Sequence, residues 1–158
     1  MTEIFIISDH HFFHNNIIRY CNRPFYSYQE MNEIMIKKWN EVVGVNDIVI
    51  HLGDFAWRGK AGLIRPQLNG TIVLIRGNHD YTVTEDDGFV IVDGNLIIRN
   101  IIFSHRPIPL AELPMGMINI FGHIHHQDVF DKTRQKNVSV EKTDYKPMRL
   151  KDIQNEYL

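Results

Sequence analysis

The sequence predicts a layered α/β or α+β fold in which helices cover the faces of β-sheets. Three observations support this prediction. The 158 residues match one domain of ordinary size, and no repeat or low-complexity linker divides residues 1–158. Short β-branched runs are mixed with amphipathic helical segments. The composition, 44 % hydrophobic and 23 % charged, is ordinary for a globular chain and excludes a disordered or fibrous one.

The predicted strands are short runs rich in isoleucine, valine and phenylalanine, which are typical of buried strands. Each run spans only three to six residues, so none is long enough to be a helix of ordinary length. The predicted strands are Ile4–Ser8, Ile48–His51, Thr71–Arg76, Leu96–Ile98, Ile101–Ser104, Met117–Gly122 and Val138–Val140.

The clearest predicted helix spans Tyr28 to about Val43. Ser27 and Glu30 have the spacing of a capping box at its start, and apolar side chains recur at helical spacing along it. Gly44 supplies a plausible stop. Shorter helical segments are expected at Gly62–Leu68 and Asp152–Tyr157.

Charge, cysteine content and the length of the apolar runs restrict the cellular compartments and the classes of binding partner to be expected. The formal net charge of −2 gives no bulk basicity of the kind that nucleic-acid or membrane binders show. Cys21 is the single cysteine, expected to be inert, and it cannot form an internal disulfide. The longest apolar runs have four residues, too short to span a membrane, and none resembles a signal peptide. We therefore expect a cytoplasmic protein without a membrane partner.

Five of the predicted strands are each followed by side chains of the kind that bind metals. The chain contains nine histidines, and several lie in short polar clusters with aspartate, asparagine or glycine. Parallel strands place their ligands beyond their carboxyl ends, and glycine permits tight turns there. The clusters are Asp9-His10-His11, Gly53-Asp54, Gly77-Asn78-His79-Asp80, His105 and Gly122-His123-Ile124-His125.

These clusters supply seven candidate ligands, which are too many for one tetrahedral zinc ion. In an extended chain, residues two apart point the same way, so Asp9 can act with His11, and His123 with His125 unless a turn intervenes. Sharing one carboxylate would give two sites of four ligands each. Carboxylate, amide and imidazole ligands without thiolate suit divalent manganese, iron or zinc rather than an iron–sulfur cluster. The candidate ligands are Asp9, His11, Asp54, Asn78, His105, His123 and His125.

The ordered motifs resemble those of the calcineurin-like metallophosphoesterases. Asp-x-His, Gly-Asp, Gly-Asn-His-Asp, a lone histidine and Gly-His-x-His follow one another between Asp9 and His125. The flanking segments His14–Ile18, Arg23–Phe25 and Leu68–Gly70 resemble the compact bacterial and phage branch, and Asn137–Val140 resembles the strand that closes small members. The resemblance implies a two-sheet sandwich flanked by helices, in a single domain without a cap.

The resemblance also implies a role for each ligand. Asp9, His11, Asp54 and His125 would hold a first metal ion, and Asp54, Asn78, His105 and His123 a second. The cofactors would be two divalent ions, with manganese expected first and iron, zinc, nickel or cobalt as alternatives. In the family, a hydroxide between the ions attacks phosphorus, and the histidine of Gly-Asn-His, here His79, is not a ligand but protonates the leaving group or stabilises the transition state. Asp80 would orient His79.

Several polar residues near these motifs have two interpretations. Arg76 and Arg106 would bind phosphate oxygens, or would form surface contacts and salt bridges instead. His14 would lie near the substrate. His10 and His126 point away from the ligands under strict alternation, which favours surface or supporting roles. His51 is expected to be a packed strand histidine with a supporting contact as the alternative.

The function that these features predict is hydrolysis of small phosphomonoesters or phosphodiesters, with a small phosphoester or nucleotide as substrate. A nuclease acting on DNA or RNA is the first alternative, although Lys132, Arg134 and Lys136 form only a short basic cluster. A non-catalytic scaffold with this fold is the second alternative, and the presence of His79 argues against it. The sequence predicts no oligomeric state.

Overall fold

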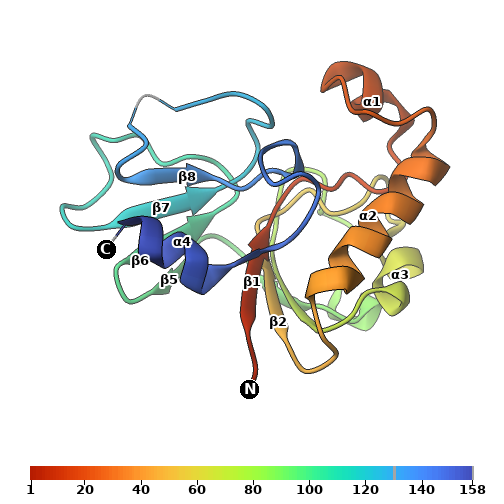
Figure 1. Cartoon of the computed structure of the whole chain (residues 1–158), viewed down its shortest axis with the longest axis horizontal. Coiled ribbons are helices and arrows are strands. Elements are labelled where there is room, and N and C mark those ends of the chain that lie inside the picture. Colours follow the sequence, from red (N-terminus) through yellow and green to blue (C-terminus); the bar gives the residue numbers. More distant parts are fainter. Residues whose placement is uncertain (130, 158) are drawn as a thin grey trace.

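The computed structural model describes residues 1–129 and 131–157, and two mixed β-sheets lie at its centre (Figure 1). The first sheet has the order β4-β3-β2-β1-β9, with β1 to β4 parallel and β9 antiparallel to β1. Its strands are β1 (Ile4–Ile7), β2 (Ile48–His51), β3 (Thr71–Ile75), β4 (Val90–Val92) and β9 (Met148–Arg149).

The second sheet has the order β5-β6-β7-β8. Strands β6, β7 and β8 are parallel, and β5 is antiparallel to β6. Because β1, β2 and β3 are parallel, as are β6 and β7, the loops after these strands leave at the carboxyl edge of each sheet. The strands are β5 (Leu96–Ile98), β6 (Ile101–Ser104), β7 (Ile118–Phe121) and β8 (Gln135–Asn137).

Helices flank the sheets, and α2 is the longest of those described (Figure 1). It begins after Ser27, whose hydroxyl accepts a hydrogen bond from the Glu30 N–H at 3.2 Å, as a capping residue does. Among the described residues, no helix combines the length and apolar character needed to cross a membrane. The α-helices are α1 (Asn15–Tyr20), α2 (Tyr28–Val42), α3 (Ala61–Ile64) and α4 (Leu150–Tyr157), and short 3-10 turns cover Arg65–Gln67, Glu85–Asp87 and Val140–Lys142.

Strand β1 contributes side chains to two separate cores, because successive residues of a strand point to opposite faces. Phe5 and Ile7 pack with Met35 and Trp39 of α2 on the helix-covered face. Ile6 packs on the other face, in the core between the two sheets. Burial of each such side chain contributes roughly 1.5–3 kcal/mol, so both faces of β1 stabilise the position of the loop that follows it.

Most predicted elements are present, and the differences have local causes. The predicted strand at Val138–Val140 is not formed; β8 lies just before it and consists of polar residues that carry no apolar signal. Ser139 instead forms an isolated parallel bridge with Ser8. The sequence analysis also missed α1, β4 and β9, which are all short. The helix expected over Gly62–Leu68 ends at Ile64, because a 3-10 turn that contains Pro66 begins at Arg65.

Candidate metal centre

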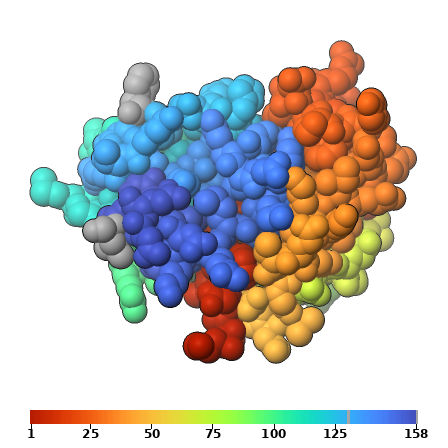
Figure 2. Space-filling model, in the orientation of Figure 1, coloured from red at the N-terminus to blue at the C-terminus, as the bar shows by residue number. Residues whose placement is uncertain are grey.

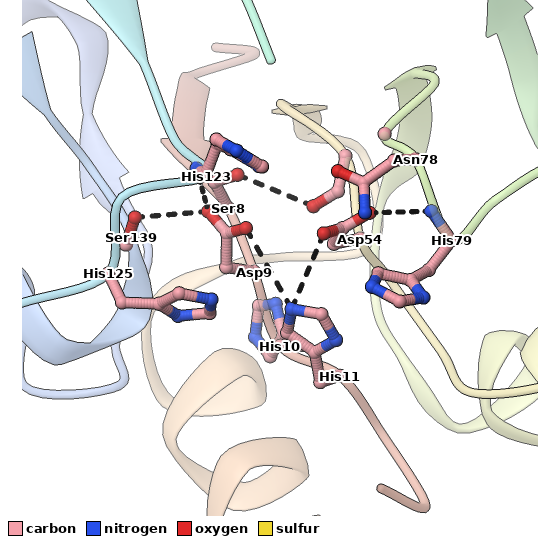
Figure 3. A network of polar contacts seen from close by, with 12 residues as sticks. Ser8, Asp9, His10, His11, Asp54, Asn78, His79, His123, His125 and Ser139 are labelled. Carbon is pink, nitrogen blue, oxygen red and sulfur yellow. Dashed lines mark hydrogen bonds and ion pairs between the residues drawn. The ribbon is translucent and has the colours of Figure 1, made fainter. Parts of the chain in front are cut away.

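Five loops converge at the carboxyl edges of the two sheets and bring the predicted ligands together (Figure 3). Ligand atoms of Asp9, His11 and His125 lie within 4.8 Å of one another, as do those of a second set, Asp54, His105 and His123. Loops after β1 and β7 supply the first set, and loops after β2, β6 and β7 supply the second. Residues up to 116 positions apart in the sequence therefore form one polar cluster.

The Asp54 carboxylate lies between the two sets. Its Oδ2 is 3.5 Å from Nε2 of His11 and also 3.5 Å from Nε2 of His105. Asn78 lies on the second side, where its Oδ1 is 3.0 Å from the same nitrogen of His105. This is the position that a carboxylate shared between two metal ions requires.

The backbone at the ligands differs from the extended chain that the sequence analysis assumed. The φ angles are 62° at Asp9, 51° at His11, 55° at Asp54, 71° at His123 and 51° at His125. A left-handed conformation costs roughly 1–2 kcal/mol for a residue other than glycine, so these turns carry strain. Such strain persists only where the surrounding structure enforces it, and it is characteristic of functional sites. Tight turns, not strand alternation, therefore aim these side chains at one another.

Glycine at two positions permits the close approach of these loops. A Cβ atom on Gly53 would lie 2.6 Å from both the Gly77 nitrogen and Nδ1 of His105. A Cβ atom on Gly122 would collide with the side chains of Ser8 and Asp9. Side chains at these positions would push the ligand loops apart.

Buried polar atoms without partners mark the centre of the cluster. Asp9 Oδ1 and both ring nitrogens of His11 have no hydrogen-bond partner among the described residues, although Asp9 is fully buried and His11 is 2 % exposed. Each such atom costs roughly 1–3 kcal/mol when it is left unpaired. Carboxylate, imidazole and amide groups are suitable ligands for divalent transition metals. The residues present therefore fit a metal centre, and a bound ion would supply the partner that the unpaired atoms lack.

The electrostatic environment keeps three of the candidate ligands, Asp54, His11 and His123, in the forms that bind cations. Burial alone would raise the pKa of Asp54, but the hydrogen bond and charge of His105, together with His11, hold that pKa well below its ordinary value. Burial lowers the pKa of His11 and, with His105, lowers the pKa of His123 to about 4. At neutral pH, Asp54 is therefore ionised, and His11 and His123 carry free lone pairs.

Hydrogen bonds fix the orientation of two ligand imidazoles. Nδ1 of His105 is 2.7 Å from the Leu52 carbonyl oxygen, which can only accept, so Nδ1 carries the proton and Nε2 faces Asp54. Nδ1 of His125 is 3.1 Å from Oε1 of Glu141. Partners of this kind orient metal ligands in many proteins.

His79 lies beside the candidate ligands. Its backbone N–H donates to Oδ1 of Asp54 at 2.9 Å, and its half-buried ring is centred 5.3 Å from the ring of His11. The other side of the ring faces Trp57, at 5.2 Å between centroids. His79 is therefore adjacent to the candidate ligands.

The structure assigns Asp80 a different role from the predicted orientation of His79. Both carboxylate oxygens accept backbone N–H groups, from Asp54 at 2.6 Å, Phe55 at 2.9 Å and Gly77 at 2.8 Å. The left-handed turn at Asp54 leaves its N–H groups unpaired within the backbone, and a buried carboxylate satisfies them. Asp80 therefore positions the loop that carries Asp54, and the sequence-based expectation for it was wrong.

The three predicted substrate residues lie in different settings. Arg76 donates to the carbonyl oxygens of Asp80 and Val83 and pairs with Asp93 at 2.8 Å, which is the salt-bridge interpretation of this residue. Arg106 is exposed and lines a groove of about 720 Å³ that reaches the ligand cluster. His14 caps α1, and its ring lies close to Trp57 at 3.8 Å between centroids.

Two histidines outside the ligand set form a buried pair. Nδ1 of His10 lies 2.9 Å from Nε2 of His51, and both residues are fully buried among aromatic side chains. The surface role considered for His10 was wrong, because the turn at Asp9 breaks the alternation on which it rested. His126 is exposed.

Sequence reasoning missed the residues that hold the candidate ligands in place through hydrogen bonds. Ser139 donates from Oγ to Oδ2 of Asp9 at 3.0 Å. Arg23 and Glu141 form a buried ion pair with a shortest distance of 2.8 Å next to Asp9 and His125. Arg23 and Ser139 were noted only as parts of flanking segments, and no local pattern marks Glu141.

The chain is similar to known proteins. A family model described as calcineurin-like phosphoesterase matches residues 2–152. An uncharacterised protein of Methanocaldococcus jannaschii is 41 % identical over 165 residues, which cover 95 % of this chain and 88 % of that protein.

Two solved structures share the fold. The crystal structure of a protein of unknown function from Aquifex aeolicus has a TM-score of 0.78 and 26 % identity, covering 98 % of this chain and 99 % of that chain. The structure of a Pseudomonas putida nuclease, MPE, has a TM-score of 0.54 and 19 % identity, covering 77 % of this chain and 60 % of that chain.

Proposed function

This chain belongs to the calcineurin-like phosphoesterase family, and from that premise we propose that it is a binuclear metal-dependent hydrolase of small phosphomonoesters and phosphodiesters. The observation that carries the proposal is the position of Asp54 at equal distances, 3.5 Å, from imidazoles of both ligand sets. A carboxylate placed in this way can serve two ions at once.

The two ligand sets define which residues would hold each ion. Bound there, two divalent ions would lower the pKa of water toward neutrality and stabilise charge on the phosphoester oxygens. The two aspartates contribute only two negative charges, so the loaded centre would stay positive and attract an anionic ester. The first ion would be held by Asp9, His11, Asp54 and His125, and the second by Asp54, Asn78, His105 and His123.

His79 would supply a proton at the leaving-group oxygen. Its backbone N–H is anchored on Asp54, and its half-buried ring lies between His11 and Trp57 without being enclosed. A positioned acid of this kind is worth roughly 10²–10⁴ in rate. Its effect is greatest for alcohols that leave poorly without a proton.

Hollows on two sides of the ligands would receive the ester. The groove of about 720 Å³ reaches Asn78 and His105 and offers the exposed guanidinium of Arg106 to phosphate oxygens. A second hollow of about 380 Å³ is lined by Tyr20, Cys21 and the loop that carries His123 and His125. Hollows on both sides suit a phosphoester that carries a substituent on each side of its phosphorus. Among the described residues no cap covers either hollow, so both hollows are accessible. His14 would contact the substrate from the side of Trp57.

Nuclease activity is the second candidate. Tyr20, which is 70 % exposed, and Trp57 both lie near the ring of His14 and would stack on bases of a single strand. The similar Pseudomonas putida protein is named a nuclease. The basic cluster gives little support, because Lys132 and Lys136 are paired with carboxylates. Small esters therefore remain the preferred substrates.

The test is hydrolysis by manganese-loaded protein of p-nitrophenyl phosphate, bis-p-nitrophenyl phosphate and a single-stranded oligonucleotide. We expect hydrolysis of at least one small ester, its loss with EDTA, and its loss in Asp54→Asn but not in Asp152→Asn, which alters an exposed carboxylate on α4. Metal-dependent hydrolysis that persists in Asp54→Asn would contradict the proposal. Cleavage of the oligonucleotide alone would favour the nuclease, and a loaded protein inert on the whole panel would favour a non-catalytic scaffold.

A further inference from the structure

We propose that Arg23 and Glu141 form a brace that positions Asp9 and His125, two ligands of the first metal ion, across the two sheets. The inference rests on the metal centre of the proposed function. It assigns a positioning role to two residues that lie outside both ligand sets and 118 positions apart in the sequence.

Arg23 holds the loop that carries Asp9. Arg23 is 4 % exposed, and its guanidinium donates from Nη2 to the Asp9 carbonyl oxygen at 2.7 Å and from Nη1 to the His10 carbonyl oxygen at 2.6 Å. Asp9 has a left-handed φ of 62°, and at this turn both carbonyl groups accept from Arg23. A single planar guanidinium with several donors can satisfy both, which an ammonium group cannot do in the same geometry.

Glu141 connects this guanidinium to His125. Its Oε1 accepts from Nε of Arg23 at 2.9 Å and lies 3.1 Å from Nδ1 of His125. An ionised carboxylate only accepts hydrogen bonds, so Nδ1 of His125 carries the proton and Nε2 is left as the ligand atom. The side chain of Glu141 is 5 % exposed, so the carboxylate has little freedom to move away from this position.

The brace directly contacts two ligands of the first ion, Asp9 and His125. Asp9 follows β1 of the first sheet, and His125 follows β7 of the second, so the Arg23–Glu141 pair ties one ligand loop of each sheet to the other. The second set has a separate support, the Leu52 carbonyl oxygen that orients His105. A substitution that removes the brace should therefore lower the affinity of the first site for its ion and leave the affinity of the second site unchanged.

Surface ion pairs hold the same segments together independently of the brace. Figure 2 shows the C-terminal region, in blue, packed against the N-terminal helices, in orange. Lys38 of α2 pairs with Asp144 at 2.9 Å, and Lys146 pairs with Glu41 of α2 at 3.0 Å. A change at Glu141 can therefore disturb the ligands without detaching the segment.

Cys21 offers a competing interpretation of Glu141. Ligand atoms of Cys21, His125 and Glu141 lie within 4.8 Å of one another, and Oε2 of Glu141 is buried without a partner among the described residues. A third cation there would face the guanidinium of Arg23, 2.8 Å from the same carboxylate, and like charges at such distances repel strongly in a buried site. We therefore assign Glu141 to the brace rather than to a third metal site.

The experiment is a manganese titration of the full chain by calorimetry and electron paramagnetic resonance. We expect Glu141→Ala to weaken one of two manganese sites by roughly 10–100-fold and to leave the other within twofold of wild type. Glu141→Gln, which keeps an acceptor oxygen, should restore part of the lost affinity. The matched control is Asp144→Asn, which neutralises a carboxylate three positions away that is 85 % exposed, and it should bind as wild type does.

Each other outcome is informative. Equal weakening of both sites, or unchanged binding in both Glu141 variants, would overturn the brace. Glu141→Ala leaves Arg23 buried and unpaired. If that variant does not fold, the test is whether Glu141→Gln weakens one manganese site and leaves the other within twofold of wild type. Weaker manganese binding in Cys21→Ser would overturn the assignment in favour of a third site. Two ions bound by a wild type that hydrolyses nothing would overturn the proposed function, and the binding data would still decide the brace.

Discussion

Asp80 accepts a hydrogen bond from the backbone N–H of Asp54 at 2.6 Å, and so the carboxylate next to the predicted acid supports the predicted bridging ligand instead. The same carboxylate accepts from Phe55 and Gly77, which ties the loop after β2 to the loop after β3. A buried acceptor that serves three N–H groups is a structural requirement of the turn at Asp54. It also explains why an aspartate can follow His79 without touching its ring.

Asp80→Ala should destabilise the metal-free protein by about 3 kcal/mol or more, because three buried N–H groups would lose their acceptor at roughly 1–3 kcal/mol each. Urea unfolding measures this loss. Asp93→Asn removes an ion pair whose carboxylate is 80 % exposed and should cost less than about 1 kcal/mol. Equal stability of the two variants would show that Asp80 does not support the Asp54 turn.

His79→Ala should slow hydrolysis of alkyl phosphoesters far more than hydrolysis of p-nitrophenyl esters. A poor leaving group needs the proton that His79 donates, and such an acid contributes roughly 10²–10⁴ in rate. The measurement is kcat of the two substrate types in wild type and variant, at saturating manganese. Equal losses for both would argue for a role in transition-state charge stabilisation rather than acid catalysis.

The stability of the metal-free protein should fall at acid pH partly through Glu141. Burial alone would raise the pKa of Glu141, but the hydrogen bond from His125 and the charge of Arg23 lower that pKa from 4.5 to about 2. A carboxyl group with a lowered pKa in the folded state stabilises that state above pH 4.5, and this contribution is lost as the pH falls toward 2.

The check is the free energy of unfolding of wild type and Glu141→Gln between pH 5 and pH 2. The difference between the two proteins should shrink steadily as the pH is lowered, because protonation makes the wild-type carboxyl neutral as well. A difference that stays constant would mean that the pKa of Glu141 is ordinary, and one that grows with acid would mean that it is raised; either result would contradict the prediction.

Regular elements with strong local signals were predictable from the sequence. Ile48–His51 and Ile101–Ser104 have the predicted bounds, and α2 begins after Ser27 as its capping pattern indicates. Elements whose stability comes from partners that are distant in the sequence were not predictable. Strand β8 is polar and depends on pairing with β7, and α1 has only six residues with a histidine as its cap.

The identities of the candidate ligands were predictable, but their geometry was not. Asp9 and His11 lie on the same side because both are in left-handed turns, whereas the sequence argument assumed an extended chain. The two side chains do lie close together, but not for the reason that the sequence argument gave. Arg23 and Glu141 could not be paired at all, because their contact depends on the docking of segments 118 residues apart.

The central claim is that the seven candidate ligands hold two ions that share Asp54, and anomalous diffraction at the manganese edge tests it most directly. Crystals of manganese-loaded protein should show two peaks, roughly 3.5–4 Å apart, on either side of the Asp54 carboxylate. A single peak at every manganese concentration, or two peaks that do not share Asp54, would contradict the account.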